Sequence, residues 1–228
     1  MRYFVMGDIH GAFSALKQCL QRSSFNYDDD TLICLGDVCD GWPQTYECVE
    51  ELLKIKHLIF ILGNHDYWTL QWAEHDELNP SWLTHGGENT IRSYKEGMPA
   101  SHLELLSNAP LYHKHQNKLF VHAGINKLLP VEDQGQEILL WDRSLFYEAM
   151  DNFKEGIETP ITDFEEIYIG HTPIHNYNLT TPTRSGEVWF MDTGAAWTGV
   201  LSIMNIETKE FFTSDLVDTL YPRGSGRV

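Results

Sequence analysis

The residues of this chain that are equipped for chemistry stand in five short motifs, each directly after an apolar run. The motifs are Gly7-Asp8-Ile9-His10-Gly11, Gly36-Asp37-Val38-Cys39-Asp40-Gly41, Gly63-Asn64-His65-Asp66, His122-Ala123-Gly124 and Gly170-His171-Thr172-Pro173. Their polar side chains are carboxylates, imidazoles and one amide, with no thiolate expected to ligate. Such a donor set suits divalent ions such as Mn²⁺, Fe²⁺ or Zn²⁺. The motifs therefore predict a metal site.

Six candidate ligands come from these motifs, which is too many for one ion that must leave room for a substrate. They are Asp8, His10, Asp37, Asn64, His122 and His171. This number fits two ions about 3.5–4 Å apart that share one carboxylate and a bridging water. Taken alone, each motif has a simpler interpretation, since Asp8 or Asp37 would also serve as a helix N-cap. Five motifs in succession favour the metal site.

Alternating β-rich and helical runs must position the first three motifs. Strands are predicted at Tyr3–Met6, Thr31–Leu35 and Leu58–Leu62, and helices at Gly11–Arg22 and Thr45–Lys56. This order implies parallel strands joined by right-handed crossovers. Because active sites in such folds lie beyond the carboxyl ends of the strands, we expect the motifs to converge at one sheet edge.

The rest of the chain continues the pattern with a helical middle and further strands. Residues 64–108 are predicted to be mostly helical, with Trp68 and Trp72 packed in the core. Further strands are predicted at Leu111–His115, Leu119–His122, Ile167–Ile169, Val188–Met191, Val200–Asn205 and Glu210–Thr213. We predict a single domain over residues 1–220 and a flexible tail over residues 221–228.

The composition argues against several classes of function. The 228 residues include 33 acidic and 16 basic side chains, for a net charge of −17. A surface this negative repels phosphate backbones and anionic headgroups, so neither nucleic acid nor a membrane is an expected partner. Because no apolar run is long enough for a signal peptide or a membrane span, we predict a cytoplasmic protein. The four cysteines lack a CxxC pair and are expected to be buried and unpaired.

In this order, the five motifs resemble the phosphoprotein phosphatase family of dinuclear metallophosphoesterases, above all its small phage and bacterial members of the lambda-phage phosphatase type. The resemblance runs from Arg2 to about Asn205. It includes Trp82-Leu83-Thr84-His85-Gly86-Gly87, Trp141-Asp142-Arg143 and Met191-Asp192-Thr193-Gly194-Ala195. It implies an α/β fold, a calcineurin-like sandwich of two central β-sheets flanked by helices.

The resemblance also implies how the ligands divide between two divalent ions, with Mn²⁺ as the first choice and Fe or Zn as alternatives. Asp37 would bridge the ions, and a hydroxide between them would attack phosphorus. The first ion would be held by Asp8 and His10, and the second by Asn64, His122 and His171.

Three further residues receive roles from the resemblance. His65 would be the general acid that protonates the leaving oxygen, and Asp40 would orient it and favour its charged form. Arg143 would bind the phosphate oxygens through its guanidinium, together with Asn64.

The chain departs from the family pattern at one position. The family motif reads Gly-Asp-x-x-Asp-Arg-Gly and its arginine is a second phosphate clamp, whereas Gly41 stands here. Losing one charge-assisted contact costs about 1.5–3 kcal/mol. Arg92 and Arg184 are the candidates to replace it, and His85 and Trp42 are candidate substrate contacts.

The leading hypothesis is a metal-dependent phosphomonoesterase of the phosphoprotein Ser/Thr phosphatase kind, acting on phosphorylated proteins, peptides or small phosphoesters. One alternative is a symmetrical dinucleoside tetraphosphate hydrolase, which the same family includes. A second alternative is an inactive regulatory or binding module on the same fold, suggested by Gly41. The oligomeric state stays open.

Overall fold

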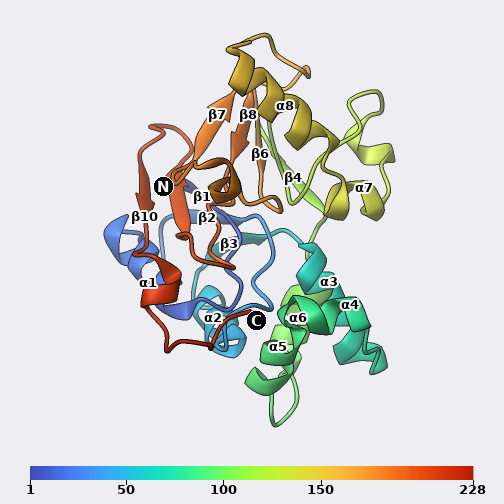
Figure 1. Cartoon of the computed structure of the whole chain (residues 1–228), viewed down its shortest axis with the longest axis vertical. Helices are drawn as coiled ribbons and strands as arrows, with labels where there is room; N and C mark the ends of the chain where they lie inside the picture. The colour runs from blue at the N-terminus through green and yellow to red at the C-terminus, as the bar shows by residue number, and fades with distance from the viewer. Residues whose placement is uncertain (228) are drawn as a thin grey trace.

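The computed structural model describes residues 1–227 and contains two five-stranded sheets (Figure 1). The first sheet has the strand order β10-β9-β1-β2-β3. Its strands are β1 (Tyr3–Met6), β2 (Thr31–Cys34), β3 (His57–Phe60), β9 (Ser202–Asn205) and β10 (Phe211–Thr213). Strands β1, β2 and β3 are parallel, as predicted, and β9 and β10 complete the sheet in antiparallel pairings.

The second sheet has the order β4-β5-β6-β8-β7. Its strands are β4 (Tyr112–His115), β5 (Lys118–Val121), β6 (Glu166–Ile169), β7 (Thr183–Ser185) and β8 (Val188–Phe190). Strands β5, β6 and β8 are parallel, and the edge strands β4 and β7 are antiparallel to their neighbours. Strand β7 was not predicted, because three polar residues carry no apolar alternation.

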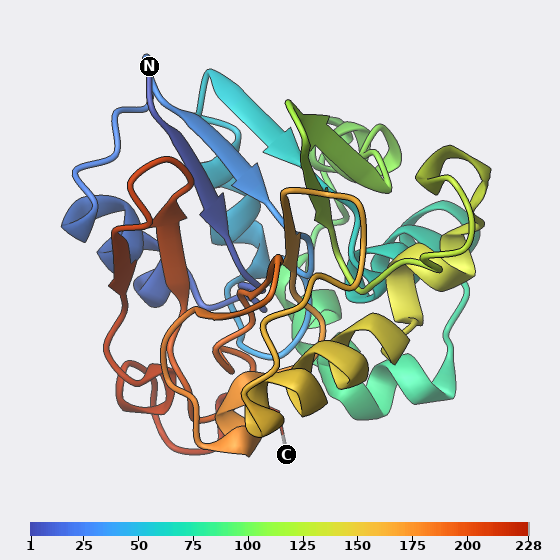
Figure 2. The same ribbon diagram turned by 90° about the horizontal axis from the view of Figure 1, so that it is seen from above.

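Along each strand, alternate residues point either into the apolar layer between the two sheets or into an apolar layer on the outer face of their own sheet. Val5 and Ile33 from the first sheet and Phe120 and Tyr168 from the second belong to one buried cluster. The rings of Phe120 and Tyr168 stack with centroids 4.7 Å apart. Since successive side chains of a strand point to opposite faces, their neighbours, such as Phe4, lie on the outer faces. The two sheets thus share an apolar layer, and the predicted two-sheet sandwich is confirmed (Figure 2).

Helices cover the outer faces of both sheets and gather beside the strand ends. Helices α1 (Phe13–Arg22) and α2 (Thr45–Leu52) pack on the first sheet, and α8 (Ser144–Glu155) packs on the second (Figure 1). The remaining helical segments are α3 (Asn64–His75), α4 (Pro80–Trp82), the π-helical turn η1 (Leu83–Gly87), α5 (Glu88–Ser93), α6 (Ala100–Ser107), α7 (Gln136–Trp141) and the 3₁₀ turns η2 (Val131–Asp133), η3 (Ile174–Tyr177) and η4 (Val217–Thr219).

Two further expectations concern the chain as a whole. Within residues 1–227, no helix has the length and apolar character needed to cross a membrane. The division into one domain over 1–220 and a flexible tail over 221–228 stays a prediction; Val228 lies outside the described residues, and residues 221–227 pack against the site described next.

Candidate active site

The five motifs meet in space, but they come from two sheets rather than from one edge of a single sheet. Asp8, Asp37 and Asn64 follow β1, β2 and β3, while His122 and His171 follow β5 and β6. The sheets bring their carboxyl ends together. The His122 Nε2 atom of the second sheet lies 3.5 Å from Asp37 Oδ2 of the first, and the His171 backbone N–H donates to Asp8 Oδ2 at 2.9 Å.

The backbone turns sharply at four of these residues. His10, Asp37, Asp40 and His171 have φ values of 52°, 51°, 69° and 64°. Non-glycine residues adopt this left-handed region rarely, at a cost of about 1–3 kcal/mol each, and such strained residues cluster at functional sites. The turns aim the side chains inward from the strand ends.

Asp66 holds this arrangement in place, although the sequence analysis assigned it no role. Its carboxylate accepts backbone hydrogen bonds from Asp37 at 2.6 Å, Gly63 at 3.0 Å and Cys39 at 3.1 Å. Asp66 is the third residue of α3 and bonds back to Gly63, the N-cap position, as acidic residues at that helix position commonly do. That N-cap signal was readable from the sequence; the contacts to the β2 turn were not.

The six candidate ligands form two groups around Asp37. On one side, His10 Nε2 lies 3.6 Å from Asp37 Oδ2 and 3.9 Å from Asp8 Oδ2. On the other, Asn64 Oδ1 lies 2.9 Å from His122 Nε2 and 2.8 Å from His171 Nδ1. Ligand atoms of Asp37, His122 and His171 all lie within 4.8 Å of one another, close enough to share a metal ion, and so do those of His10, Asp37 and His65.

Backbone carbonyls orient two of the imidazoles. His10 Nδ1 lies 3.0 Å from the Cys39 carbonyl and His122 Nδ1 lies 2.8 Å from the Leu35 carbonyl. A carbonyl only accepts, so each Nδ1 carries the proton and each Nε2 keeps its lone pair facing Asp37. Histidine ligands of metals are generally held this way.

An unsatisfied polar atom and buried carboxylates show that this cluster fits cations. Within the described chain, the buried Asp8 Oδ1 has no hydrogen-bond partner. Burial raises the pKa of Asp8 well above its usual range, that of Asp37 to about 8 and that of Asp192 to about 7. Buried carboxylates that lack a counter-charge are costly, and divalent ions would relieve that cost. Asp192, which follows β8, is a buried acid of the site that the sequence analysis left without a role.

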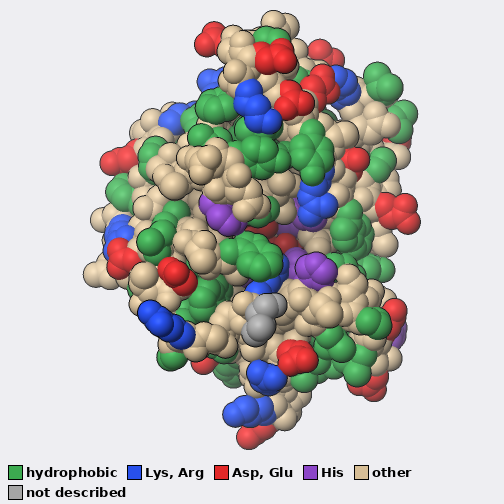
Figure 3. Space-filling view, in the orientation of Figure 1, with side chains coloured by type: hydrophobic (Ala, Val, Ile, Leu, Met, Phe, Trp, Pro, Cys, Tyr) green, Lys and Arg blue, Asp and Glu red, His purple; other side chains and the backbone are tan. Residues whose placement is uncertain are grey.

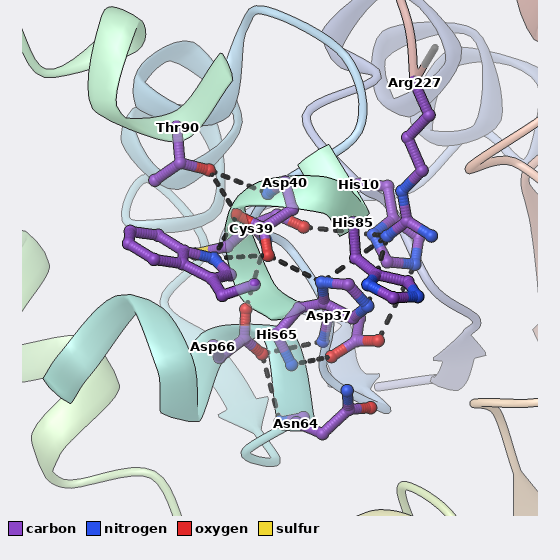
Figure 4. A network of polar contacts seen from close by, with 12 residues as sticks. His10, Asp37, Cys39, Asp40, Asn64, His65, Asp66, His85, Thr90 and Arg227 are labelled. Carbon is purple, nitrogen blue, oxygen red and sulfur yellow. Dashed lines mark hydrogen bonds and ion pairs between the residues drawn. The ribbon is translucent and has the colours of Figure 1, made fainter. Parts of the chain in front are cut away.

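His65 and Asp40 form a second unit beside this cluster (Figure 4). His65 Nδ1 donates to Asp40 Oδ2 at 2.6 Å. The same carboxylate accepts from Trp82 Nε1 at 2.8 Å and from Thr90 Oγ1 at 2.8 Å. The bond to Asp40 fixes the tautomer of His65 with a proton on Nδ1, so Nε2 faces the cavity, where Arg227 Nη2 lies 3.1 Å from it.

Burial opposes the expected effect of Asp40 on its partner. It lowers the pKa of His65 well below the usual 6.5, and the Arg227 guanidinium acts in the same direction. Burial also raises the pKa of Asp40 to about 7, against the bonds from Thr90 and Trp82. Asp40 orients His65 as expected, but the low polarity of the surroundings works against a charged imidazolium.

A cavity of about 670 Å³ opens over these groups, and Figure 3 shows acidic, basic and histidine side chains gathered in the hollow at the centre of this face. Arg143 and His85 line it, and their contact with a substrate stays a prediction. Trp68, predicted to lie in the core, lines it instead, with Trp141 and Trp197.

Three other candidates lie away from the cavity wall. Trp42 is buried, and its Nε1 donates to the Ala195 carbonyl at 2.8 Å, so it packs rather than facing a substrate. Arg92 pairs with Glu88 at 2.8 Å on the surface. Arg184 lies over the Trp189 ring at 5.8 Å. Neither arginine replaces the one missing at position 41.

The chain was compared with known proteins and structures. It matches the family described as calcineurin-like phosphoesterase over residues 1–197. Serine/threonine-protein phosphatase 1 of Salmonella typhimurium is 27% identical over 212 residues, covering 90% of this chain and 91% of that protein. The symmetrical bis(5′-nucleosyl)-tetraphosphatase of Pseudomonas putida is 24% identical over 282 residues, covering 96% and 94%.

A solved structure supports the same fold. The crystal structure of a protein provisionally described as a diadenosine tetraphosphatase has a TM-score of 0.69 and 19% identity, covering 93% of this chain and 92% of that one. The expected resemblance and the predicted hydrolase class, a phosphoesterase, are confirmed. The chain belongs to the calcineurin-like phosphoesterase family.

Proposed function

We propose that this protein hydrolyses phosphomonoesters with the help of two divalent metal ions, acting on phosphorylated serine or threonine residues of proteins and peptides. The observation that carries this proposal is the meeting of five candidate metal-ligand side chains around a sixth, Asp37, next to the His65–Asp40 pair. The similarity to a serine/threonine-protein phosphatase supports this substrate class. The cytoplasmic location, and the exclusion of nucleic acids and membranes as partners, stay predictions.

The candidate ligands would divide into two sets, one for each metal ion. Asp37 lies between the two groups and would contact both ions. Bound there, two ions, Mn²⁺ in our proposal with Fe or Zn as alternatives, would supply Lewis-acid chemistry by polarising phosphoryl oxygens and acidifying a water. The ligands would be Asp8 and His10 on one side and Asn64, His122 and His171 on the other.

Proton donation and phosphate binding would be carried out by side chains of the protein. His65 faces the cavity through Nε2. Once protonated there it would donate that proton to the leaving oxygen, while Asp40 keeps the other proton on Nδ1. Asn64 turns its Oδ1 toward His122 and His171, so its amide N–H groups are available to a phosphate oxygen. Arg143 lies exposed at the start of α8 and would bind two phosphate oxygens through its forked guanidinium.

The first test is metal dependence with a matched substitution. Chelation should abolish hydrolysis of p-nitrophenyl phosphate and added Mn²⁺ should restore it, whereas Asp37→Asn should abolish turnover even with Mn²⁺. Asp133→Asn is the matched control, because Asp133 is exposed in η2 and should keep full activity. Turnover that survives both chelation and Asp37→Asn would contradict the two-metal proposal.

A second candidate, the symmetrical dinucleoside tetraphosphate hydrolase, is favoured by one observation. Trp68, Trp141 and Trp197 line the cavity, and aromatic faces bind flat groups such as nucleobases by stacking. The Pseudomonas putida relative carries that name. Comparing turnover of a phosphopeptide and of diadenosine tetraphosphate by chromatography separates the two. An inactive module would bind Mn²⁺ and turn over neither.

A further inference from the structure

An arginine far from the motifs in sequence reaches into the active-site cavity. Arg227 lines the cavity, and its Nη2 atom lies 3.1 Å from His65 Nε2 and 3.2 Å from His10 Nδ1 (Figure 4). Its guanidinium therefore sits between a candidate metal ligand and the proposed general acid.

This guanidinium has no carboxylate in contact among the described residues, although the charges of Asp8, Asp37, Asp40 and Asp192 act on it from further away. Among residues 1–227 it forms no ion pair with a carboxylate, and its buried Nε has no hydrogen-bond partner. The His10 Nδ1 atom already donates to the Cys39 carbonyl, so it cannot accept from Arg227 as well. A guanidinium carries five N–H groups in a fork that matches phosphate oxygens. Within residues 1–227 its one side-chain acceptor is His65 Nε2, 3.1 Å from Nη2, so most of its N–H groups are available to an oxyanion ligand.

The segment that carries Arg227 is packed onto the site. The Tyr221 ring stacks on Trp42 with centroids 4.8 Å apart, and Tyr221 Oη accepts from the Ser14 backbone N–H at 3.1 Å. Asn89 Nδ2 donates to the Ser225 carbonyl at 3.0 Å and to the Gly41 carbonyl at 2.6 Å. Asn89 thus ties the segment to the turn where the family arginine is missing.

The backbone around Gly41 leaves little room for a side chain of its own. Gly41 has φ +81°, and a Cβ there would lie 3.0 Å from His10 Cβ. A Cβ on Gly86 would lie 2.5 Å from the Gly41 nitrogen and 3.2 Å from Arg227 Nε. The absence of a side chain at Gly86 therefore leaves room for Arg227, and Gly41 has no room of its own to spare.

We infer that Arg227 is a phosphate-binding residue of the active site and takes the place of the arginine absent at position 41. With Arg143 it would grip the phosphoryl group of the substrate by charge-assisted hydrogen bonds. The inference rests on the proposed phosphoesterase function. It explains why Trp42 packs under residues 221–227 and why neither Arg92 nor Arg184 is needed at the site.

Substitutions at position 227 test the inference in Mn²⁺-loaded protein. Arg227→Ala should lower kcat/KM for p-nitrophenyl phosphate about 10- to 100-fold, the effect of losing one charged hydrogen-bonding partner. The kcat/KM of Arg227→Lys should lie between those of the wild type and Arg227→Ala, because lysine keeps the positive charge and lacks the forked N–H groups. Arg223→Ala is the matched control, since Arg223 is an exposed arginine of the same segment and should leave kcat/KM unchanged.

A binding measurement keeps the inference separate from the proposed function. Titration calorimetry with inorganic phosphate should show affinity falling about 10-fold or more in Arg227→Ala and not in Arg223→Ala. If the wild type binds phosphate but turns over no phosphoester, the proposed function fails while Arg227 is still tested by binding. Unchanged phosphate affinity in folded Arg227→Ala would overturn the inference. So would a rise in kcat/KM, which would make residues 221–227 an inhibitory plug.

Discussion

At the scale of single residues, the orientation of the His65 ring is fixed by hydrogen bonds and by packing. Its Nδ1 donates to Asp40, and Asp40 accepts from Trp82 and Thr90, so three hydrogen bonds fix the orientation of one imidazole. The ring also packs edge-on against Trp68 with centroids 5.1 Å apart. An imidazole this constrained presents Nε2 in a single direction, which a proton donor requires.

The general-acid role of His65 predicts that its loss depends on the leaving group. His65→Ala should lower kcat about 10²- to 10⁴-fold for phenyl phosphate, whose leaving group needs a proton. The loss should be much smaller for p-nitrophenyl phosphate, whose leaving group departs readily as an anion. The measurement is kcat on both esters, with His75→Ala, exposed at the far end of the same helix, as control. Equal losses on both esters would assign His65 to binding or folding instead.

Site residues that could be predicted from the sequence are placed by local structure, and those that could not are placed by contacts between distant parts of the chain. The six candidate ligands were readable because each directly follows a strand, and strand ends of parallel pairs meet. Asp192 carried the same signal, because it directly follows the predicted strand Val188–Met191, but it was assigned no role. Arg227 gave no comparable signal, because its place depends on how residues 192–227 fold back over the first sheet. Trp68 was assigned to the core because helical spacing alone does not distinguish a core face from a cavity wall.

At the scale of elements, every described strand except β7 was predictable from the sequence, but the way the strands group into two sheets was not. Predicted strand boundaries agree with the structure to within two residues, since buried apolar runs mark them clearly. Residue spacing alone predicted that all the motifs lie at the edge of one sheet. The second sheet was predicted only from the family resemblance. The pairing of β1 with β9 joins residues far apart in the chain, and no local pattern encodes it.

A buried ion-pair cluster links the two sheets at the end away from the motifs. Glu166, which begins β6, bonds Lys118 of β5 at 2.7 Å and Lys209 of the β9–β10 turn at 2.6 Å. Burial alone would raise the pKa of Glu166, but the bonds from these lysines and Tyr168 outweigh it and hold the pKa at about 2. Because the folded-state pKa lies below its usual 4.5, the ionised Glu166 stabilises the fold above that pH.

Glu166→Gln should therefore destabilise the protein in a pH-dependent way. At pH 7 the free energy of unfolding should fall by about 3 kcal/mol, because Lys118 and Lys209 lose a buried partner. The difference from wild type should shrink as the pH falls from 4.5 toward 2, where the wild-type carboxyl takes up its proton. Urea unfolding of both proteins between pH 7 and pH 2 measures this difference in the free energy of unfolding. Glu165→Gln, a mostly exposed neighbour 3.7 Å from Lys118, should change stability by less than about 1 kcal/mol at any pH.

At the scale of the whole molecule, the net charge of −17 is unevenly distributed. The cavity has Arg143 and Arg227 on its walls and, in our proposal, two divalent cations at its floor. Residues 132–166, which include α7 and α8, carry eleven acids and two bases. The result is a site that attracts phosphate inside a surface that repels anions.

This charge pattern predicts selection among phosphopeptides by their flanking residues. A basic phosphopeptide should be hydrolysed with a kcat/KM about 10-fold or more above that of an acidic one at low salt, because steering acts on association. The gap should close near 1 M salt, where the screening length is about 3 Å and exposed charges no longer interact. Measuring kcat/KM for both peptides against salt checks this, and p-nitrophenyl phosphate reports any salt effect on the site itself. Equal values for the two peptides at low salt would show that the acidic surface plays no part in choosing a substrate.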